Sequence, residues 1–189
     1  MSQRIRSFIA VDIDDPILVD KITRIQSSIA ESGTRLKLVE KENFHITLRF
    51  LGEIPQSLVD RVIDALKKIS FNSFYIELKG VGAFPSIARP RVVWIGINKG
   101  FEELKKIHDA VEKELSRIGF PKDKEDFVAH LTIARVKGTY NLSKLSAILR
   151  KLQGIEIGEF KVTSIRLKKS TLTPRGPIYS TLYEQRALQ

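Results

Sequence analysis

Cysteine is absent from this sequence of 189 residues, and methionine and tryptophan occur once each. Without cysteine the chain forms no disulfide bond, thiol nucleophile or thiolate metal site, so nothing requires an oxidising compartment and we expect a cytoplasmic protein. Long apolar runs are also lacking, because the run from Phe8 to Val11 is too short for a signal peptide or a membrane span. We therefore expect no association with a membrane.

Acidic residues are outnumbered by basic ones. There are 32 lysines and arginines against 22 aspartates and glutamates, which gives a formal net charge of +10. Because both signs are interspersed, the excess belongs to the folded surface and suits a polyanionic partner, although solubility alone would also explain it. An apolar content of 42% suits one compact domain, or two small lobes that share a core.

The two halves of the sequence have the same order of predicted elements. A strand over 4–11 and an amphipathic helix that ends near Gly33 begin the first half, and a strand over 91–97 and a helix that ends near Gly119 repeat them. Each half continues with a second strand, which contains a histidine, and with a second helix. This order predicts an α+β protein of two similar lobes, each an antiparallel sheet backed by two helices.

We interpret 1–189 as a single bilobal domain with an approximate internal repeat of 1–85 and 86–189. His45 lies 45 − 33 = 12 residues past Gly33, and His130 lies 130 − 119 = 11 residues past Gly119, so the two histidines occupy equivalent places. If a rough two-fold axis relates the halves, a central cleft on that axis brings these histidines face to face.

Two of the three histidines lie in nearly identical segments, Phe44-His45-Ile46-Thr47-Leu48 and Ala129-His130-Leu131-Thr132-Ile133. In a strand, successive side chains alternate between faces. Each histidine therefore shares a face with its threonine, while the apolar residues of each segment face the opposite side. We expect the apolar face to contact a helix-covered core and the His/Thr face to line the cleft.

Two imidazoles across a cleft suit the opening of a cyclic phosphodiester. This reaction needs a base to take a proton from water and an acid to protonate the departing sugar oxygen on the other side of phosphorus. The ordinary pKa of histidine, near 6.5, allows one ring to be neutral and the other protonated around neutral pH. Thr47 and Thr132 would donate hydrogen bonds to nonbridging phosphate oxygens, so the scheme needs no metal.

At these residues the sequence resembles the LigT-like RNA 2',3'-cyclic phosphodiesterases, or 2'-5' RNA ligases, of the two-histidine phosphoesterase superfamily, whose mark is a pair of His-x-Thr-x motifs. The resemblance covers essentially the whole chain. Beyond His45-Ile46-Thr47-Leu48 and His130-Leu131-Thr132-Ile133, it is carried by Arg6-Ser7-Phe8-Ile9-Ala10, the extension from Asn43 to Glu53, Gly82-Ala83-Phe84-Pro85, Pro90-Arg91-Val92-Val93-Trp94 and Gly176-Pro177-Ile178-Tyr179.

The resemblance implies a bilobal fold with a central cleft and hydrolysis of 2',3'-cyclic phosphate RNA ends, including those of tRNA fragments, to 2'-phosphomonoesters. It also implies reversible 2'-5' joining of tRNA halves. It assigns His45 as the proton donor and His130 as the proton acceptor, a direction that the symmetric argument from the residues leaves open. We expect a monomer that uses no cofactor and no metal.

Arginines and an aromatic residue near the motifs are candidates for binding phosphate or RNA. Arg135 matches a family arginine that contacts phosphate, but its offset from His130, 135 − 130 = 5, is odd, so it reaches the cleft only if the strand bulges or ends first. Arg49, at an offset of 4 from His45, has the parity of the cleft face. Phe84, Arg89 and Arg91 lie in or beside a loop, where a ring can stack on a base and arginines can bind phosphate.

Two further side chains with aromatic rings, Phe50 and His108, are expected to have no part in catalysis or RNA binding. Phe50 has the parity of the apolar residues of its strand, so we expect it in the core. His108 has no threonine partner, and we expect it at the surface of its helix.

Three other functions compete with this one. A basic RNA-binding module without catalysis would suit the charge, although no aromatic RNP motif is present. A two-histidine enzyme could instead act on small cyclic nucleotides or 2'-5' oligonucleotides. A metal-dependent hydrolase is disfavoured because the three histidines are dispersed and form no ligand motif.

Overall fold

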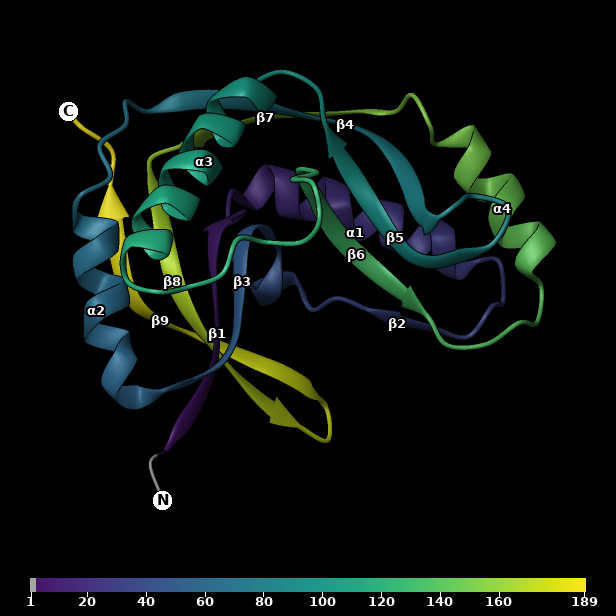
Figure 1. Cartoon of the computed structure of the whole chain (residues 1–189). Helices are drawn as coiled ribbons and strands as arrows, with labels where there is room; N and C mark the ends of the chain where they lie inside the picture. The colour runs from purple at the N-terminus through teal and green to yellow at the C-terminus, as the bar shows by residue number, and fades with distance from the viewer. Residues whose placement is uncertain (1–2) are drawn as a thin grey trace.

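A computed structural model describes residues 3–189 as one curled antiparallel sheet with four α-helices (Figure 1). The helices are α1 (Pro16–Ala30), α2 (Gln56–Lys67), α3 (Phe101–Arg117) and α4 (Leu142–Lys151). The strands are β1 (Arg4–Asp12), β2 (Leu36–Leu38), β3 (His45–Pro55), β4 (Phe74–Pro85), β5 (Pro90–Ile97), β6 (His130–Val136), β7 (Glu156–Val162), β8 (Ser164–Thr173) and β9 (Gly176–Arg186).

The strand order is symmetric about its centre. It runs β7-β4-β5-β6-β3-β1-β8-β9, and β2 pairs with β6 outside this path. We call β3, β1, β8 and β9 lobe 1, and β6, β5, β4 and β7 lobe 2. The two lobes meet where β3 pairs with β6, so the strands that carry the His-x-Thr motifs form the junction.

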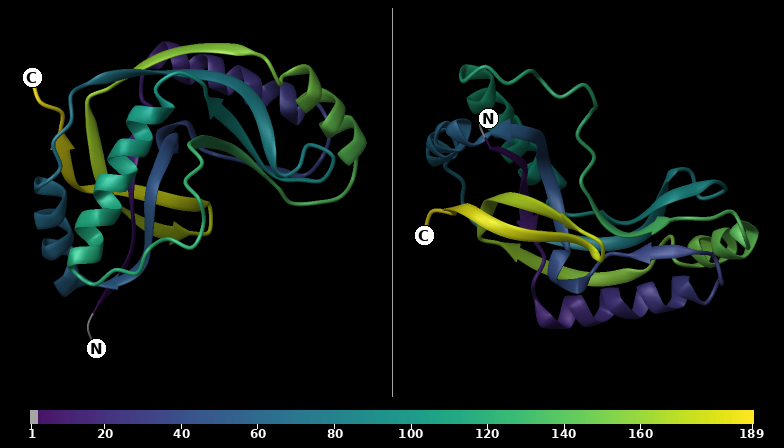
Figure 2. Two further views of the ribbon diagram at one scale, coloured as in Figure 1. Left: turned by 45° about the horizontal axis from the view of Figure 1, so that its top comes forward. Right: turned by 90° about the horizontal axis from the view of Figure 1, so that it is seen from below.

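Each lobe is covered by two helices, as the sequence predicts. Helices α2 and α3 contact lobe 1, whereas α1 and α4 contact lobe 2, and the two pairs occupy different ends of the molecule (Figure 2). The α+β fold of two similar lobes is thus confirmed. Helix α1 follows a strand of lobe 1 but packs on lobe 2, and α3 follows a strand of lobe 2 but packs on lobe 1, so the lobes exchange helices.

The strands also cross between the lobes. β4 lies in the first half of the sequence but pairs with β5 and β7 of lobe 2, while β8 and β9 lie near the end of the sequence and extend lobe 1. Neither lobe is therefore a continuous half of the chain. Local periodicity predicts the helices and the longer strands but does not indicate on which lobe each element packs.

Local sequence explains where the helices begin and end. The side chain of Asp15 accepts hydrogen bonds from the amides of Ile17 and Leu18, both at 3.0 Å, and Pro16 occupies the first helical position of α1. Asn141 precedes α4, but it has a positive φ of 58° and its side chain makes no capping hydrogen bond. Its backbone, and not its amide group, adapts to the turn.

The apolar face of each motif strand is buried against the helices. Phe44, Ile46 and Leu48 are buried on β3 and just before it, and Ala129, Leu131 and Ile133 are buried in the same way around β6. The motif histidines and threonines remain half-buried on the other face. Within residues 3–189, no helix is long and apolar enough to cross a membrane.

Candidate active site

The motif strands meet at one antiparallel pair, Ile46 with Leu131. In an antiparallel register, one step to either side sets His45 opposite Thr132 and Thr47 opposite His130. The four polar side chains thus share one face, and the pseudo-two-fold axis passes between Ile46 and Leu131. The structure therefore brings together all four residues that the motifs single out.

Each histidine ring is oriented by the same backbone contact. Nδ1 of His45 lies 2.7 Å from the carbonyl oxygen of Asn43, and Nδ1 of His130 lies 2.7 Å from that of Val128, two residues earlier in both cases. Because a carbonyl oxygen only accepts hydrogen bonds, Nδ1 carries a hydrogen in each ring. Nε2 is therefore the nitrogen available for proton transfer, and that of His45 lies 3.0 Å from the hydroxyl of Thr47.

The surroundings of His45 favour its neutral form. Burial lowers its pKa from the ordinary 6.5, because desolvation disfavours the imidazolium, while the carbonyl of Asn43 and the carboxylate of Asp12 act in the opposite direction. The positive charge of Lys168 lowers this pKa further, and a proton on His130 would act in the same direction. His130 is therefore close enough to influence His45 electrostatically, as expected of two imidazoles in one cleft.

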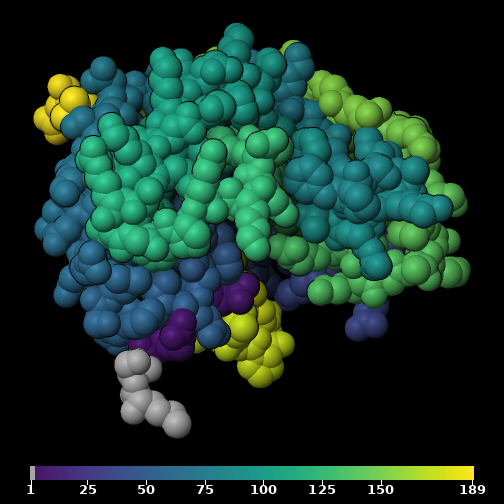
Figure 3. Space-filling view, viewed as in Figure 1, coloured from purple at the N-terminus to yellow at the C-terminus, as the bar shows by residue number. Residues whose placement is uncertain are grey.

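The two histidines have different neighbours despite the symmetry. The ring of His45 lies 4.9 Å from that of Phe8 and 5.4 Å from that of Tyr179, centroid to centroid. The ring of His130 lies 5.1 Å from that of Phe84 and 6.4 Å from that of Trp94. The space-filling view shows a recess at the centre of this face, between the green segment that precedes β6 and the yellow β8–β9 hairpin (Figure 3).

A partly buried charge network lies beside His45. Asp12 is its register partner, and one Asp12 carboxylate oxygen accepts hydrogen bonds from Lys168 and Arg166, both at 2.7 Å. Lys168 is only 8% exposed. The motif analysis did not find these residues, because a network of this kind depends on strands that are far apart in the sequence.

A β-bulge follows each motif threonine. Ile9 and Ala10 pair with Arg49 and Thr47, which leaves Leu48 as an extra residue in β3. Val93 and Trp94 pair with Ala134 and Thr132, which leaves Ile133 as an extra residue in β6. Both extra residues stand three places after the histidine, so alternation reverses at the same point in both strands.

The bulges decide the places of the two candidate arginines. Arg135 is exposed and shares the face of Thr132, because the bulge in β6 reverses the odd offset that the sequence gives it. The expected parity of Arg49 is wrong: the bulge in β3 turns it to the helix side, where it is 8% exposed and forms an ion pair with Glu112. Arg49 therefore supports the fold and does not line the cleft.

The two structural expectations for Phe50 and His108 are also wrong. Phe50 follows the same bulge and is 43% exposed on the cleft face. His108 is buried, with Nδ1 2.8 Å from the carbonyl oxygen of Leu48 and its ring stacked on Phe127 at 4.4 Å.

Buried side chains from the exchanged helices hold both bulges. On α3, His108 donates to the carbonyl of Leu48, the extra residue in β3. On α1, Gln26 is 5% exposed and its Nε2 donates at 2.9 Å to the carbonyls of Ile133, the extra residue in β6, and of Val39. His108 and Gln26 thus have equivalent functions in the two lobes.

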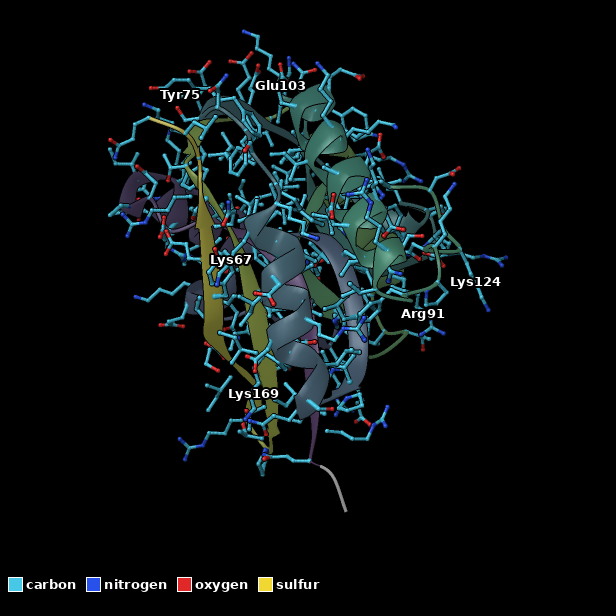
Figure 4. All side chains as sticks on the ribbon, turned by 60° about the vertical axis from the view of Figure 1, so that its left-hand side comes forward. Lys67, Tyr75, Arg91, Glu103, Lys124 and Lys169 are labelled. Carbon is cyan, nitrogen blue, oxygen red and sulfur yellow. The ribbon has the colours of Figure 1, made fainter. Side chains whose placement is uncertain are left out.

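The remaining predicted RNA-binding residues lie on lobe 2. Phe84 lies beside His130, as its ring distance shows. Arg89 is exposed in the loop between β4 and β5. Arg91 projects from the edge of the molecule (Figure 4), and strand alternation gives it the side of Val93, away from Trp94. The structure therefore groups Phe84 with the histidines and leaves the two arginines at the rim.

Tyr179 is a cleft residue that parity in the sequence did not identify. Burial raises the pKa of its hydroxyl, while the positive charges of Arg135 and Arg6 lower it. One arginine from each lobe therefore contributes to the electrostatic environment of this hydroxyl. Within residues 3–189, no three histidine, aspartate or glutamate side chains are grouped so that they could hold a metal ion.

This cleft thus brings the two His-x-Thr motifs together about a pseudo-two-fold axis. The model of the LigT-like phosphoesterase family matches the chain twice, over residues 13–94 and 95–179. A protein of Aeropyrum pernix named RNA 2',3'-cyclic phosphodiesterase is 48% identical over 170 residues, which cover 90% of this chain and 97% of that protein. One of Archaeoglobus fulgidus with the same name is 44% identical and covers 94% and 97%.

Solved structures agree with the sequence comparison. The crystal structure of E. coli LigT in apo form has a TM-score of 0.78 and 21% identity over the full length of both chains. A crystal structure of a Thermus thermophilus protein has a TM-score of 0.81 and 22% identity, covering 96% of this chain and 97% of its own. The chain belongs to the LigT-like phosphoesterases, as the paired motifs predicted.

Proposed function

We propose that this protein hydrolyses 2',3'-cyclic phosphate ends of RNA to 2'-phosphomonoesters. The observation that carries the proposal is the placement of two Nε2 atoms, His45 and His130, from symmetric strands on one cleft face. The curated relatives named RNA 2',3'-cyclic phosphodiesterase and the net charge of +10 support an RNA substrate. Both histidines come from one chain, so a monomer suffices.

In the proposed reaction His130 accepts a proton from water as the water oxygen attacks phosphorus. The bond between phosphorus and the 3' oxygen breaks, and His45 gives its proton to that oxygen, so the phosphate remains on the 2' oxygen. Thr47 and Thr132 donate hydrogen bonds to the nonbridging oxygens, and Arg135 balances their charge from the rim of the cleft.

The surroundings of His45 bear on its role as proton donor. Burial lowers its pKa in the free protein, whereas an anionic phosphate in the cleft raises the pKa of a nearby imidazole. We propose that His45 takes up a proton as the substrate binds. The same displacement with a 5' hydroxyl in place of water would join RNA ends: the 5' oxygen attacks phosphorus and gives its proton to His130, and the 3' oxygen leaves with the proton of His45, which forms a 2'-5' bond.

The test is to incubate the protein with an RNA that ends in a 2',3'-cyclic phosphate and to determine by ³¹P NMR which oxygen retains the phosphate. We expect a 2'-phosphate. His45→Ala and His130→Ala should each lower turnover by about 10²–10⁴-fold, while circular dichroism shows an unchanged fold. A variant of either histidine that keeps the wild-type rate removes that residue from the mechanism.

Parallel assays separate the alternatives. Faster turnover of 2',3'-cyclic AMP or of a 2'-5' oligonucleotide than of the RNA would redefine the substrate. Tight RNA binding without hydrolysis would indicate a binding module. Activity that disappears in EDTA and returns with a divalent ion would overturn the two-histidine scheme.

A further inference from the structure

Phe50 is an apolar residue that lies exposed on its strand, while the charged residue before it, Arg49, is buried. Its parity with Ile46 and Leu48 would bury it in an ideal strand, yet the bulge at Leu48 turns it to the cleft face with 43% of its surface exposed. Its equivalent in the other motif strand, five places after the histidine, is Arg135. The same backbone device thus presents a ring from lobe 1 and a guanidinium from lobe 2.

This arrangement has to be stabilised elsewhere in the protein. The bulge that exposes Phe50 also buries Arg49, whose charge is satisfied by Glu112 and by the carbonyls of Phe50 at 2.6 Å and Pro121 at 2.5 Å. His108 is a further buried polar group bound to the bulge. A regular strand would need none of these contacts, because it would bury the ring and expose the charge.

A cation covers the exposed ring. The guanidinium carbon of Arg6 lies 5.0 Å from the centroid of Phe50, which is within the range of a cation–π contact. Glu53 is the register partner of Arg6, but no ion pair joins them, and Arg6 forms none with any other residue of 3–189. The ring holds the guanidinium plane in place while its N–H groups remain available to an anion.

The platform formed by Arg6 and Phe50 adjoins the proposed catalytic pair without touching it. Phe8 lies between them, since it is the register partner of Phe50 and its ring lies 4.9 Å from that of His45. On the other side of the cleft, the ring of Phe84 lies 5.1 Å from that of His130, and in the proposed reaction the base of the terminal nucleotide would stack on it. Phe50 lies one side chain further out, where the preceding nucleotide of a chain would be.

We propose that Arg6 and Phe50 form a binding site for the nucleotide that precedes the cyclic phosphate end. The base stacks on the guanidinium and the ring, and the N–H groups of Arg6 bind the phosphodiester that links the last two nucleotides. The site therefore favours an oligonucleotide over a cyclic mononucleotide. This inference rests on the proposed function.

The experiment compares 2',3'-cyclic AMP with a diadenosine that ends in a 2',3'-cyclic phosphate. Phe50→Ala should lose on the order of tenfold more kcat/KM on the dinucleotide than on the mononucleotide, and Arg6→Gln should behave alike, because base stacking contributes on this scale. Phe50→Trp should restore the preference. A matched control is Tyr75→Ala, since Tyr75 is 58% exposed and also has a cation, Lys161, 5.9 Å from its ring.

The control residue lies far from the cleft, near the start of β4 and close to the end of α3 that carries Glu103 (Figure 4). Equal losses on both substrates, or none on either, would overturn the inference. Should the wild-type protein open neither substrate, the proposed function fails, and fluorescence anisotropy with a labelled diadenosine 2'-phosphate then decides the binding site alone. Wild-type affinity in Phe50→Ala would also overturn it.

Discussion

Replacing Gln26 by methionine should lower both the stability of the fold and the affinity of the site for its substrate. Both Nε2 hydrogens of Gln26 are used at 2.9 Å, on the carbonyls of Val39 and Ile133, and methionine has similar volume but no donor. In the variant the carbonyl of Ile133 still accepts a hydrogen bond from the amide of Val39 at 3.0 Å. The carbonyl of Val39 loses the hydrogen bond that it accepts from Gln26. The two lost hydrogen bonds, one buried and one partly buried, amount to about 1–3 kcal/mol of unfolding free energy.

The bulge at Ile133 depends on this contact, so the variant should also release Arg135 from the cleft face. We expect KM for a cyclic phosphate RNA to rise several-fold while kcat changes less, because Arg135 is proposed to bind phosphate in both the ground and transition states. Urea unfolding and steady-state kinetics measure the two effects.

The matched control is Gln185→Met. Nε2 of Gln185 donates at 2.9 Å to the carbonyl of Ile69, remote from both motifs, so this change should lower stability and leave KM unaltered. If Gln26→Met lost less than about 1 kcal/mol, or lost stability with an unchanged KM, the proposed dependence of Arg135 on Gln26 would be refuted.

Three further predictions concern other parts of the structure. In Lys168→Met the pKa of His45 should rise, since a positive charge that lowers this pKa is removed. A ¹H–¹⁵N NMR titration of the imidazole measures this pKa, and a lower or unchanged value would contradict the prediction. Leu131→Ala empties a fully buried position and should cost about 2–5 kcal/mol in urea unfolding; a loss below this range would mean that the junction repacks. Arg49→Met leaves Glu112 without its partner and should cost about 3–5 kcal/mol, part of which a second change, Glu112→Gln, recovers; additive losses would contradict the pairing.

The paired motifs predicted the centre of the site because their information is local. Alternation alone places His45 with Thr47 and His130 with Thr132, and it buries the apolar residues between them. The structure agrees at each of these positions. The symmetric spacing of the histidines from Gly33 and Gly119 likewise predicted two similar lobes.

Strand alternation predicted the wrong faces for residues after the threonines, because contacts from residues far away in the sequence hold a β-bulge there. The bulges are held by His108 and Gln26, which come from helices that lie 60 and 107 residues away in sequence from their partners. No pattern within the strand indicates such a contact, so Arg49 and Phe50 were assigned to the wrong faces. The sequence predicted a place for Arg135 in the cleft only on the condition that its strand bulges or ends first.

The exchange of elements between lobes bears on how the protein can be divided. A cut in the loop between β4 and β5 would give one fragment with β1 to β4 and another with β5 to β9, and each would hold strands of both lobes. Neither piece could bury its helices alone, so we expect the fragments to fold only when they are expressed together. Because the chain passes between the lobes several times, covalent connections as well as the pairing of β3 with β6 join the two halves of the site.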